Sequence, residues 1–351
     1  MSALRSVEWV LIAGCAFGAQ AQQGCEPSGE VGYVCGVTNP EDLVLVPGTP
    51  WIVSSGMAEG AGFYLVDSAS GNVTVLPFEA QPDPKFAGCP TPPSPQTLNT
   101  HGLNIRANGP GRARLNAVGH GAREAIEMFD IDSTGARPTL TWRGCVTMPE
   151  GLAANSVASF ADGSLVATVL FMPGTTFADA IVARKPTGAV FEWSPGDAGF
   201  KLVEGSQLPA NNGIEVSADG REIYVASSGL QTIVALSHSN PTRQLRTTRP
   251  LPFTPDNVHL GPDGRLLTAG MANDVPECGG APGPQHDLAK LAACPRPTIA
   301  MAIDPATMRD TVIATTSADA KFSNATMVLT AAGQAWIGTF SGNKIARAPL
   351  R

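Results

Sequence analysis

Polar residues recur at similar distances before glycine turns along this chain, and their chemistry is that of a metal site. They lie six to nine residues upstream of turn glycines, at the start of short apolar segments: Glu41, Asp42, His101, Asn155, Asn212, Asp256, Asn257 and, less regularly, Asn324, where Ser323 or Thr326 are alternatives. Carboxylate and amide oxygens without thiolates are hard donors that suit Ca²⁺, with Mg²⁺ second because it prefers a tighter octahedron and more water. The pattern predicts a calcium site if the fold brings these residues together.

Each of these residues also has a purely structural interpretation. A single Asn at a strand start is often a turn cap, and Asp42 could be a solvated loop acid. The metal-site hypothesis therefore depends on the shared register, in which three segments carry Asn and two carry Glu or His. Asp162, Asp219 and Asp263 belong to the turns themselves and are expected to be structural.

Histidines near this set could move protons. His101 shares the register, and His120 follows on the next predicted strand, where it could pair with His101 or serve only as a loop residue. A neutral His accepts a proton from water, and Ca²⁺ polarises a carbonyl, so these residue types suffice for ester or lactone hydrolysis. The remaining histidines are expected on the surface or in loops, with His259 left open: His238, His259 and His286. No Gly-x-Ser-x-Gly segment is present, which argues against a serine hydrolase.

The elements that must position these residues are six predicted β-hairpins. Their turn glycines are Gly48, Gly109, Gly163, Gly220, Gly264 and Gly333. Asp-Gly and Asn-Gly between apolar segments are strong hairpin signals, and a four-stranded propeller blade takes roughly 40–50 residues. We therefore predict an all-β, six-bladed β-propeller whose first strands line a central channel, in preference to a β-sandwich.

The N-terminus resembles an export signal. Arg5 precedes a short apolar run, and Ala19-Gln20-Ala21 is a small-x-small cleavage site, so we predict a signal peptide over residues 1–21 and one propeller domain over 22–351. The protein is then expected to be secreted or periplasmic. Alternatively, Ile12-Ala13-Gly14-Cys15 resembles a lipobox, which would place a lipid anchor at Cys15 and hold the protein at the membrane surface.

Cysteine usage agrees with export, and the net charge limits the possible partners. Beyond Cys15, six cysteines remain, an even number that suggests disulfides, with Cys25–Cys35 and Cys278–Cys294 plausible local pairs. No CxxC or Cys/His cluster indicates zinc. The net charge of −7 without a basic run argues against nucleic acid as a partner, and no segment beyond the leader is apolar enough to span a membrane.

Short motifs in the right order resemble the paraoxonase/arylesterase family, within the wider gluconolactonase-like calcium propellers. The resemblance runs from about residue 35 to the C-terminus and is carried by Asn39-Pro40-Glu41-Asp42-Leu43, His101-Gly102-Leu103, Val118-Gly119-His120, Ala154-Asn155-Ser156, Asn211-Asn212-Gly213-Ile214, Pro255-Asp256-Asn257-Val258 and Trp336-Ile337-Gly338-Thr339-Phe340.

The resemblance implies roles for these positions. Glu41, Asn155, Asn212, Asp256 and Asn257 would bind a catalytic Ca²⁺, with His101 as the base and His120 as its relay partner. Asp42 and the carbonyl of Leu103 would bind a second, structural Ca²⁺, but Ser156 stands where family members often carry Asp.

The implied activity is hydrolysis of lactones or aryl esters. A sugar-lactone hydrolase and a non-enzymatic calcium-stabilised binding propeller are the alternatives. Specificity is expected to lie in the loops Pro82 to Thr100, Met172 to Lys185 and Asn273 to Pro297.

Overall fold

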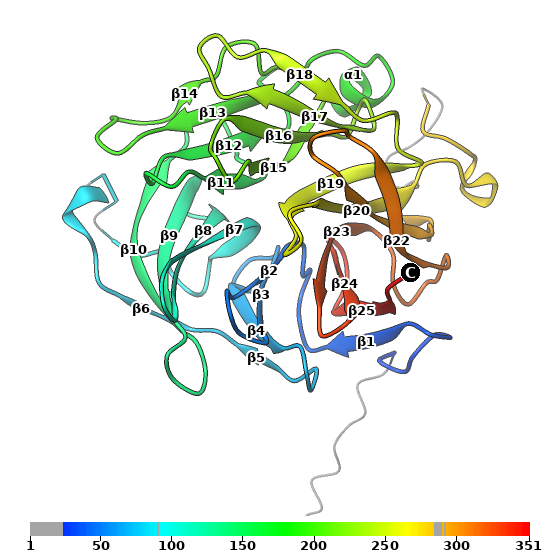
Figure 1. Ribbon diagram of the computed structural model, residues 1–351, viewed down its shortest axis with the longest axis horizontal. Helices are drawn as coiled ribbons and strands as arrows, with labels where there is room; N and C mark the ends of the chain where they lie inside the picture. The colour runs from blue at the N-terminus through cyan, green and yellow to red at the C-terminus, as the bar shows by residue number, and fades with distance from the viewer. Residues whose placement is uncertain (1–23, 87, 90, 284–289, 291–292) are drawn as a thin grey trace, which may run out of the picture.

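The computed structural model describes residues 24–351, except 87, 90, 284–289 and 291–292. Its six sheets are arranged as the blades of a β-propeller around a central channel (Figure 1). This confirms the predicted fold class. The predicted signal peptide and Cys15 lie outside the described residues.

Each blade contains an antiparallel meander of three or four strands that runs from the innermost strand outward, and blades 2 and 6 each gain an outer strand, β6 or β1, from earlier in the chain. Blade 1 comprises β2 (Leu43–Leu45), β3 (Trp51–Ser55), β4 (Phe63–Asp67) and β5 (Val73–Val75). Blade 2 comprises β7 (Asn99–Gly109), β8 (Arg112–His120), β9 (Ala125–Asp132), β10 (Thr139–Thr147) and the parallel edge strand β6 (Phe78–Ala80). Blade 3 comprises β11 (Val157–Ser159), β12 (Leu165–Val169), β13 (Ala189–Trp193) and β14 (Lys201–Leu202).

Blade 4 comprises β15 (Asn211–Val216), β16 (Glu222–Ser227), β17 (Thr232–Ser237) and β18 (Gln244–Thr247). Blade 5 comprises β19 (Phe253–Leu260), β20 (Leu266–Ala272), β21 (Thr298–Ile303) and β22 (Asp310–Thr316). Blade 6 comprises β23 (Ala325–Ala331), β24 (Gln334–Thr339), β25 (Lys344–Pro349) and β1 (Gly32–Cys35). All six predicted hairpins are therefore present, each formed by the first two strands of a blade. The described residues also contain α1 (Phe177–Ile181) and two 3₁₀ turns, η1 (Pro84–Phe86) and η2 (Pro276–Cys278).

The ring of blades is closed by strand pairing between the two ends of the chain. β1 is the outermost strand of blade 6 and pairs antiparallel with β25, with Gly32 opposite Arg347 and Cys35 opposite Lys344. The predicted Cys25–Cys35 disulfide anchors the segment before β1, and Cys278–Cys294 forms as predicted, with Cα–Cα distances of 6.1 and 5.8 Å. The third pair is Cys89–Cys145.

The core consists of apolar clusters between neighbouring blades. Between blades 1 and 2, for example, the rings of Phe63 and Phe129 meet edge to face, with centroids 5.1 Å apart. Because every blade is packed on both sides, middle strands such as β12 are buried at every position. This explains apolar runs in the sequence that do not alternate with polar residues.

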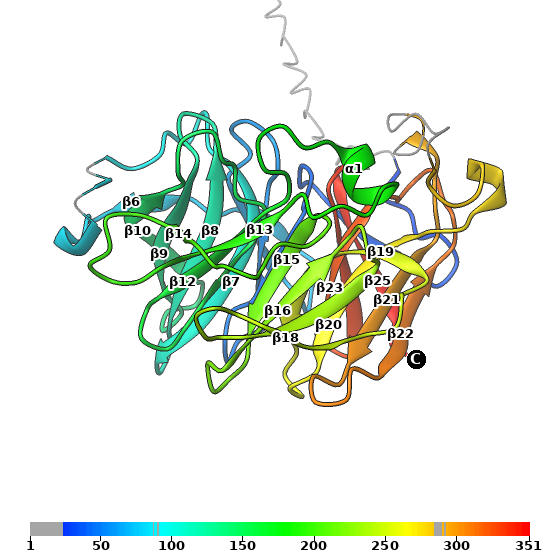
Figure 2. The ribbon, with the colours of Figure 1, turned by 90° about the horizontal axis from the view of Figure 1, so that it is seen from above.

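No described helix is long and apolar enough to cross a membrane. The short helix α1 lies in the loop from Met172 to Lys185, where no helix was predicted. Thr176 and Asp179 form a reciprocal capping box at its start. Seen from the side, α1 and η2 lie on the same face of the disc (Figure 2), which is the face that carries the site described next.

Candidate metal and proton-transfer site

Irregularities in the inner strands position the predicted ligands. In four blades, the pairing of the first two strands skips two residues at the polar position, between Thr100 and Leu103, Asn211 and Ile214, Pro255 and Val258, and Ala325 and Val328. In the other two, Glu41 and Asn155 lie two residues before the first strand. Such bulges re-aim side chains, and here they fall in the inner strands of blades 2, 4, 5 and 6.

Glycines next to the ligands allow the inner strands to approach closely. A Cβ on Gly102 would lie 2.6 Å from Cα of Ser156, and one on Gly213 would lie 2.5 Å from Cα of Asn257. Both are contacts that real Cβ atoms do not make. The short His-Gly and Asn-Gly motifs are thus explained by packing around the channel.

The five residues predicted to bind a catalytic cation, Glu41, Asn155, Asn212, Asp256 and Asn257, are here called the oxygen ring. Asn257 donates a hydrogen bond from Nδ2 to Oε1 of Glu41 at 2.6 Å, which joins blades 5 and 1. Asn212 donates through Nδ2 to the Ser228 hydroxyl at 3.2 Å, and its side chain also bonds to Asp256.

Four oxygens of this ring are buried without any hydrogen-bond partner among the described residues: Glu41 Oε2, Asn155 Oδ1, Asn212 Oδ1 and Asn257 Oδ1. An orphaned buried acceptor costs about 1–3 kcal/mol. In all three Asn side chains it is the carbonyl oxygen that lacks a partner. A bound cation would satisfy all four at once, so the donor set fits a hard divalent ion.

The electrostatics of the ring also favour a cation. Burial, followed by the nearby Asp256 and Asp42 carboxylates, raises the pKa of Glu41 well above its usual range. Burial and Asp42 raise the pKa of Asp256 to about 7, against the opposing hydrogen bond from Asn212. The ring contributes two carboxylates, and the described residues hold no cluster of three or more His, Cys, Asp or Glu side chains arranged for a metal. Amides therefore supply the remaining donors.

A chain of side chains leads outward from the ring. His101 Nε2 lies 3.8 Å from Glu41 Oε2, His101 Nδ1 lies 3.1 Å from His120 Nε2, and His120 Nδ1 lies 2.6 Å from Glu124 Oε2. The structure thus brings the predicted histidine pair together. Glu124 was not anticipated from the sequence, although it follows His120 by four residues across the turn between β8 and β9.

The order of hydrogen bonds sets the tautomers. The Glu124 carboxylate accepts from His120 Nδ1, so His120 Nε2 is left to accept from His101 Nδ1. His101 Nε2 then carries a lone pair directed at the ring. Burial, followed by the neighbouring His120, lowers the pKa of His101 to about 3, which keeps it neutral.

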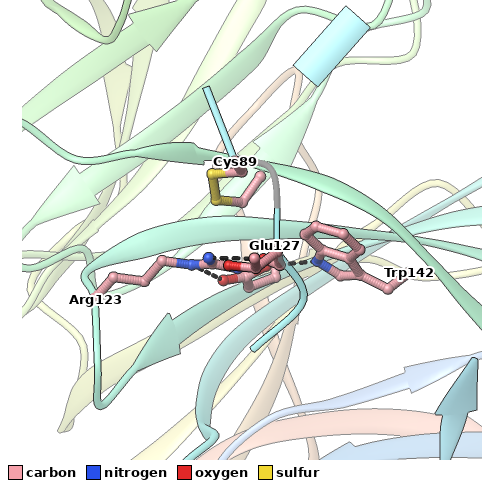
Figure 3. Close-up of a disulfide and its surroundings, with 6 residues drawn as sticks. Cys89, Arg123, Glu127 and Trp142 are labelled. Carbon is pink, nitrogen blue, oxygen red and sulfur yellow. Dashed lines mark hydrogen bonds and ion pairs between the residues drawn. A yellow bond between two sulfur atoms is a disulfide. The ribbon is translucent and has the colours of Figure 1, made fainter. Parts of the chain in front are cut away.

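A buried cluster behind the relay fixes the turn that carries Glu124. The Arg123 guanidinium donates to both oxygens of Glu127 at 2.7 and 3.0 Å, and Trp142 Nε1 donates to the same carboxylate at 2.7 Å. Figure 3 shows this group beside Cys89 of the Cys89–Cys145 disulfide. Arg123 also donates to the carbonyl of Thr91, so the turn is attached to the neighbouring loop.

A cavity of about 360 Å³ adjoins the ring on the face that carries α1. Asn212 and Asp256 line it together with the aromatic and aliphatic side chains of Phe171, Phe177, Ile181, Met271 and Phe340. Two of the three loops predicted to set specificity contribute to its wall, through Phe177 in one and Pro282 and Arg296 in the other.

The residues assigned to a second cation are arranged differently. Asp42 is fully buried and bonds through Oδ1 to His259 Nε2 at 2.8 Å, and His259 Nδ1 lies 3.7 Å from Glu215 Oε2. Leu103 contacts Asp42 through its N–H, at 2.7 Å. His259 is therefore not a surface residue: its side chain is 12% exposed, and on β19 it lies two residues beyond Asn257.

The three side chains Asp42, Glu215 and His259 are here called the histidine latch. Burial alone lowers the pKa of His259, but Asp42 and then Glu215 reverse this and raise it to about 10. Glu215 and His259 also line a cavity of about 250 Å³ that includes Pro47 and Pro262 of the hairpin turns, so the latch faces the opposite end of the channel from the α1 face.

The chain matches no known family profile and no curated protein sequence. Solved structures resemble it over most of their length. A gluconolactonase from Xanthomonas campestris is 15% identical, with 92% of this chain and 89% of that one covered and a TM-score of 0.53. The calcium-binding protein regucalcin from Agrobacterium tumefaciens is 10% identical, with 91% and 93% covered and a TM-score of 0.51. A luciferin-regenerating enzyme is 12% identical, with 90% and 92% covered and a TM-score of 0.53.

At these identities the likeness concerns architecture. The narrower resemblance to paraoxonases and arylesterases remains a prediction from motifs. The structural neighbours are gluconolactonase- and regucalcin-like propellers, and the fold of this chain is the six-bladed β-propeller that they share.

Proposed function

We propose that this protein is a calcium-dependent hydrolase of lactones or aryl esters. The observation that carries the proposal is the oxygen ring: blades 1, 3, 4 and 5 each contribute a buried oxygen without a partner among the described residues, and one of these, Glu41 Oε2, lies 3.8 Å from the neutral His101. A cation held there would polarise the substrate carbonyl and stabilise the oxyanion that develops during attack.

The relay supplies the proton acceptor. His101 Nε2 takes a proton from the attacking water, and the resulting imidazolium is stabilised through His120 by the Glu124 carboxylate. Because Glu124 is 39% exposed, the far end of the relay reaches solvent, so the proton can leave without crossing the substrate pocket. A purely structural cation needs no such relay, which favours an enzyme over a non-enzymatic binding propeller.

The cavity over the ring favours an apolar substrate. Phe171, Phe177 and Phe340 contribute aromatic walls that can bury an alkyl chain or an aryl leaving group. A sugar lactone carries several hydroxyls that each need a hydrogen-bond partner when buried. The lining thus supports lactones with aliphatic substituents, or aryl esters, over the sugar-lactone alternative that the gluconolactonase neighbour suggests.

The test is a substrate panel. The full chain is assayed with a chromogenic aryl ester, an alkyl-substituted lactone and gluconolactone, before and after metal depletion and after calcium is restored. We expect calcium-dependent turnover of the first two at higher kcat/KM than of gluconolactone. Activity that persists after metal depletion and in His101→Gln would contradict the metal–histidine mechanism.

A further inference from the structure

The second cation implied by the resemblance does not fit the residues that would hold it. Every carboxylate oxygen of the histidine latch is already occupied by a donor. Asp42 Oδ1 accepts from the Leu43 N–H at 2.8 Å and bonds to His259, and Asp42 Oδ2 accepts from the Leu103 N–H. Glu215 Oε1 accepts from the Val216 N–H at 2.9 Å, and Oε2 accepts from the Leu260 N–H at 3.2 Å.

The imidazole ring of His259 also occupies the space between the two acids. Its nitrogens face opposite carboxylates, at 2.8 Å from Asp42 and 3.7 Å from Glu215. Displacing the ring would leave its nitrogens and both acids without these contacts. Ser156 supplies only a neutral hydroxyl where family members often carry Asp, so the resemblance's set for this ion keeps one carboxylate, that of Asp42.

We propose that His259 takes the place of the second cation, so that the chain binds one divalent ion, in the oxygen ring, and closes the rest of the channel with its own side chain. The latch connects three blades, since Asp42 precedes β2, Glu215 lies on β15 and His259 on β19, and the Leu103 N–H on β7, which donates to Asp42, adds a fourth. A structural cation would join blades in the same way. This inference depends on the proposed function, because the one ion expected per chain is the cation proposed for the oxygen ring.

A consequence concerns metal removal. The histidine latch consists of side chains of the protein itself, so a chelator cannot remove it. We therefore expect the metal-depleted chain to keep its propeller fold while losing the ion of the ring.

The experiment measures bound calcium per chain, by native mass spectrometry and elemental analysis, in the full chain and in two variants. The full chain is expected to bind one ion and Glu41→Gln none. His259→Asp, which replaces the ring by a third carboxylate between Asp42 and Glu215, is expected to bind a second ion. His238→Asp is the matched control, because His238 is a partly exposed histidine that pairs with Glu192 on the outside of the propeller, and it should stay at one ion.

Two ions in the full chain, or one ion retained by Glu41→Gln, would overturn the proposal. If the full chain binds no ion, the ring assignment and the proposed function fail instead. Should His259→Asp not fold, the comparison between the full chain and Glu41→Gln still decides the question.

Discussion

The oxygen ring and the histidine latch lie in the same channel and are built from adjacent residues, yet their hydrogen bonding is opposite. Glu41 and Asp42 are neighbours in sequence and both are buried. Glu41 Oε2 has no partner among the described residues, whereas both oxygens of Asp42 are bonded. Buried polar groups are normally satisfied, so orphaned acceptors in one layer and complete pairing in the next separate a ligand site from a structural one.

Neutralising the ring is expected to have the largest effect. Glu41→Gln removes one of its two carboxylates, so calcium affinity should fall by more than about 100-fold and hydrolysis should be lost with it. Calorimetric titration with calcium and the aryl ester assay measure the two effects. Glu79→Gln, an exposed acid on β6, is the control and should behave as the parent chain. Unchanged calcium binding in Glu41→Gln would refute the ring.

Removing the proton acceptor should separate chemistry from metal binding. His101→Gln is expected to lower kcat by about 10²- to 10⁴-fold while bound calcium stays at one ion, because His101 lies beside the ring without being a proposed ligand. Steady-state kinetics and metal analysis on the same preparation test this. A loss of calcium in His101→Gln would show that the histidine acts on the metal site instead of on the proton.

Disrupting the histidine latch is expected to lower the stability of the protein whether or not calcium is bound. His259→Ala leaves the buried Asp42 and Glu215 without their shared partner, and removing one member of a buried ion pair costs about 3–5 kcal/mol. Denaturant unfolding should record this loss in calcium-saturated and metal-depleted samples alike. His238→Ala should change stability much less. A loss that appears only in the calcium-saturated samples would assign His259 to the metal site.

The oxygen ring could be predicted from the sequence to a greater extent than the histidine latch. Glycine turns between apolar segments revealed all six hairpins, four of them through Asp-Gly or Asn-Gly. The register of Asn155, Asn212 and Asp256 before such turns indicated the ring. The latch gave no comparable signal. Asn257 and His259 would face the same side of a regular strand, but Asp256, on the opposite side, was also a predicted ligand, so the sequence did not show which side faces the channel. In the structure the pairing skips Asp256 and Asn257, between Pro255 and Val258, and such an irregularity has no sequence signal of its own here.

Glu124 and α1 escaped prediction for a related reason. Glu124 lies in a short turn where an acid is usually solvated, and its role depends on Arg123 holding that turn against Glu127 in the next strand. The helix α1 has only five residues, too few for a hydrophobic period. Both depend on contacts that are distant in sequence.

The stabilising effect of calcium should depend on pH. Burial raises the folded-state pKa of Asp256 from 3.8 to about 7 when no cation is bound. The metal-depleted protein should therefore lose stability as pH rises from about 4 to about 7, because the ionised acid is buried at a cost. A bound cation offsets that cost. The difference in Tm between calcium-saturated and metal-depleted protein should thus widen as the pH rises. Scanning calorimetry across this pH range measures it, and a constant difference in Tm would contradict the role assigned to Asp256.

The smallest expected effect is at the outer end of the relay. Glu124→Gln keeps a side-chain oxygen that can accept from His120 Nδ1, so the histidine tautomers persist while the charge is lost. We expect kcat to fall by about 10-fold, with KM and bound calcium unchanged. Glu150→Gln, on the same face but outside the relay, is the control. An unaltered kcat across the pH range would remove Glu124 from the relay.

The two layers can be distinguished most directly by locating the ion. Crystals of the full chain soaked with Tb³⁺, a calcium substitute with strong anomalous scattering, would show each occupied site as a peak in the anomalous difference map. The account predicts one channel peak, bordered by Glu41, Asn212 and Asn257. A peak between Asp42 and Glu215, with the His259 ring displaced, or an empty oxygen ring would contradict it.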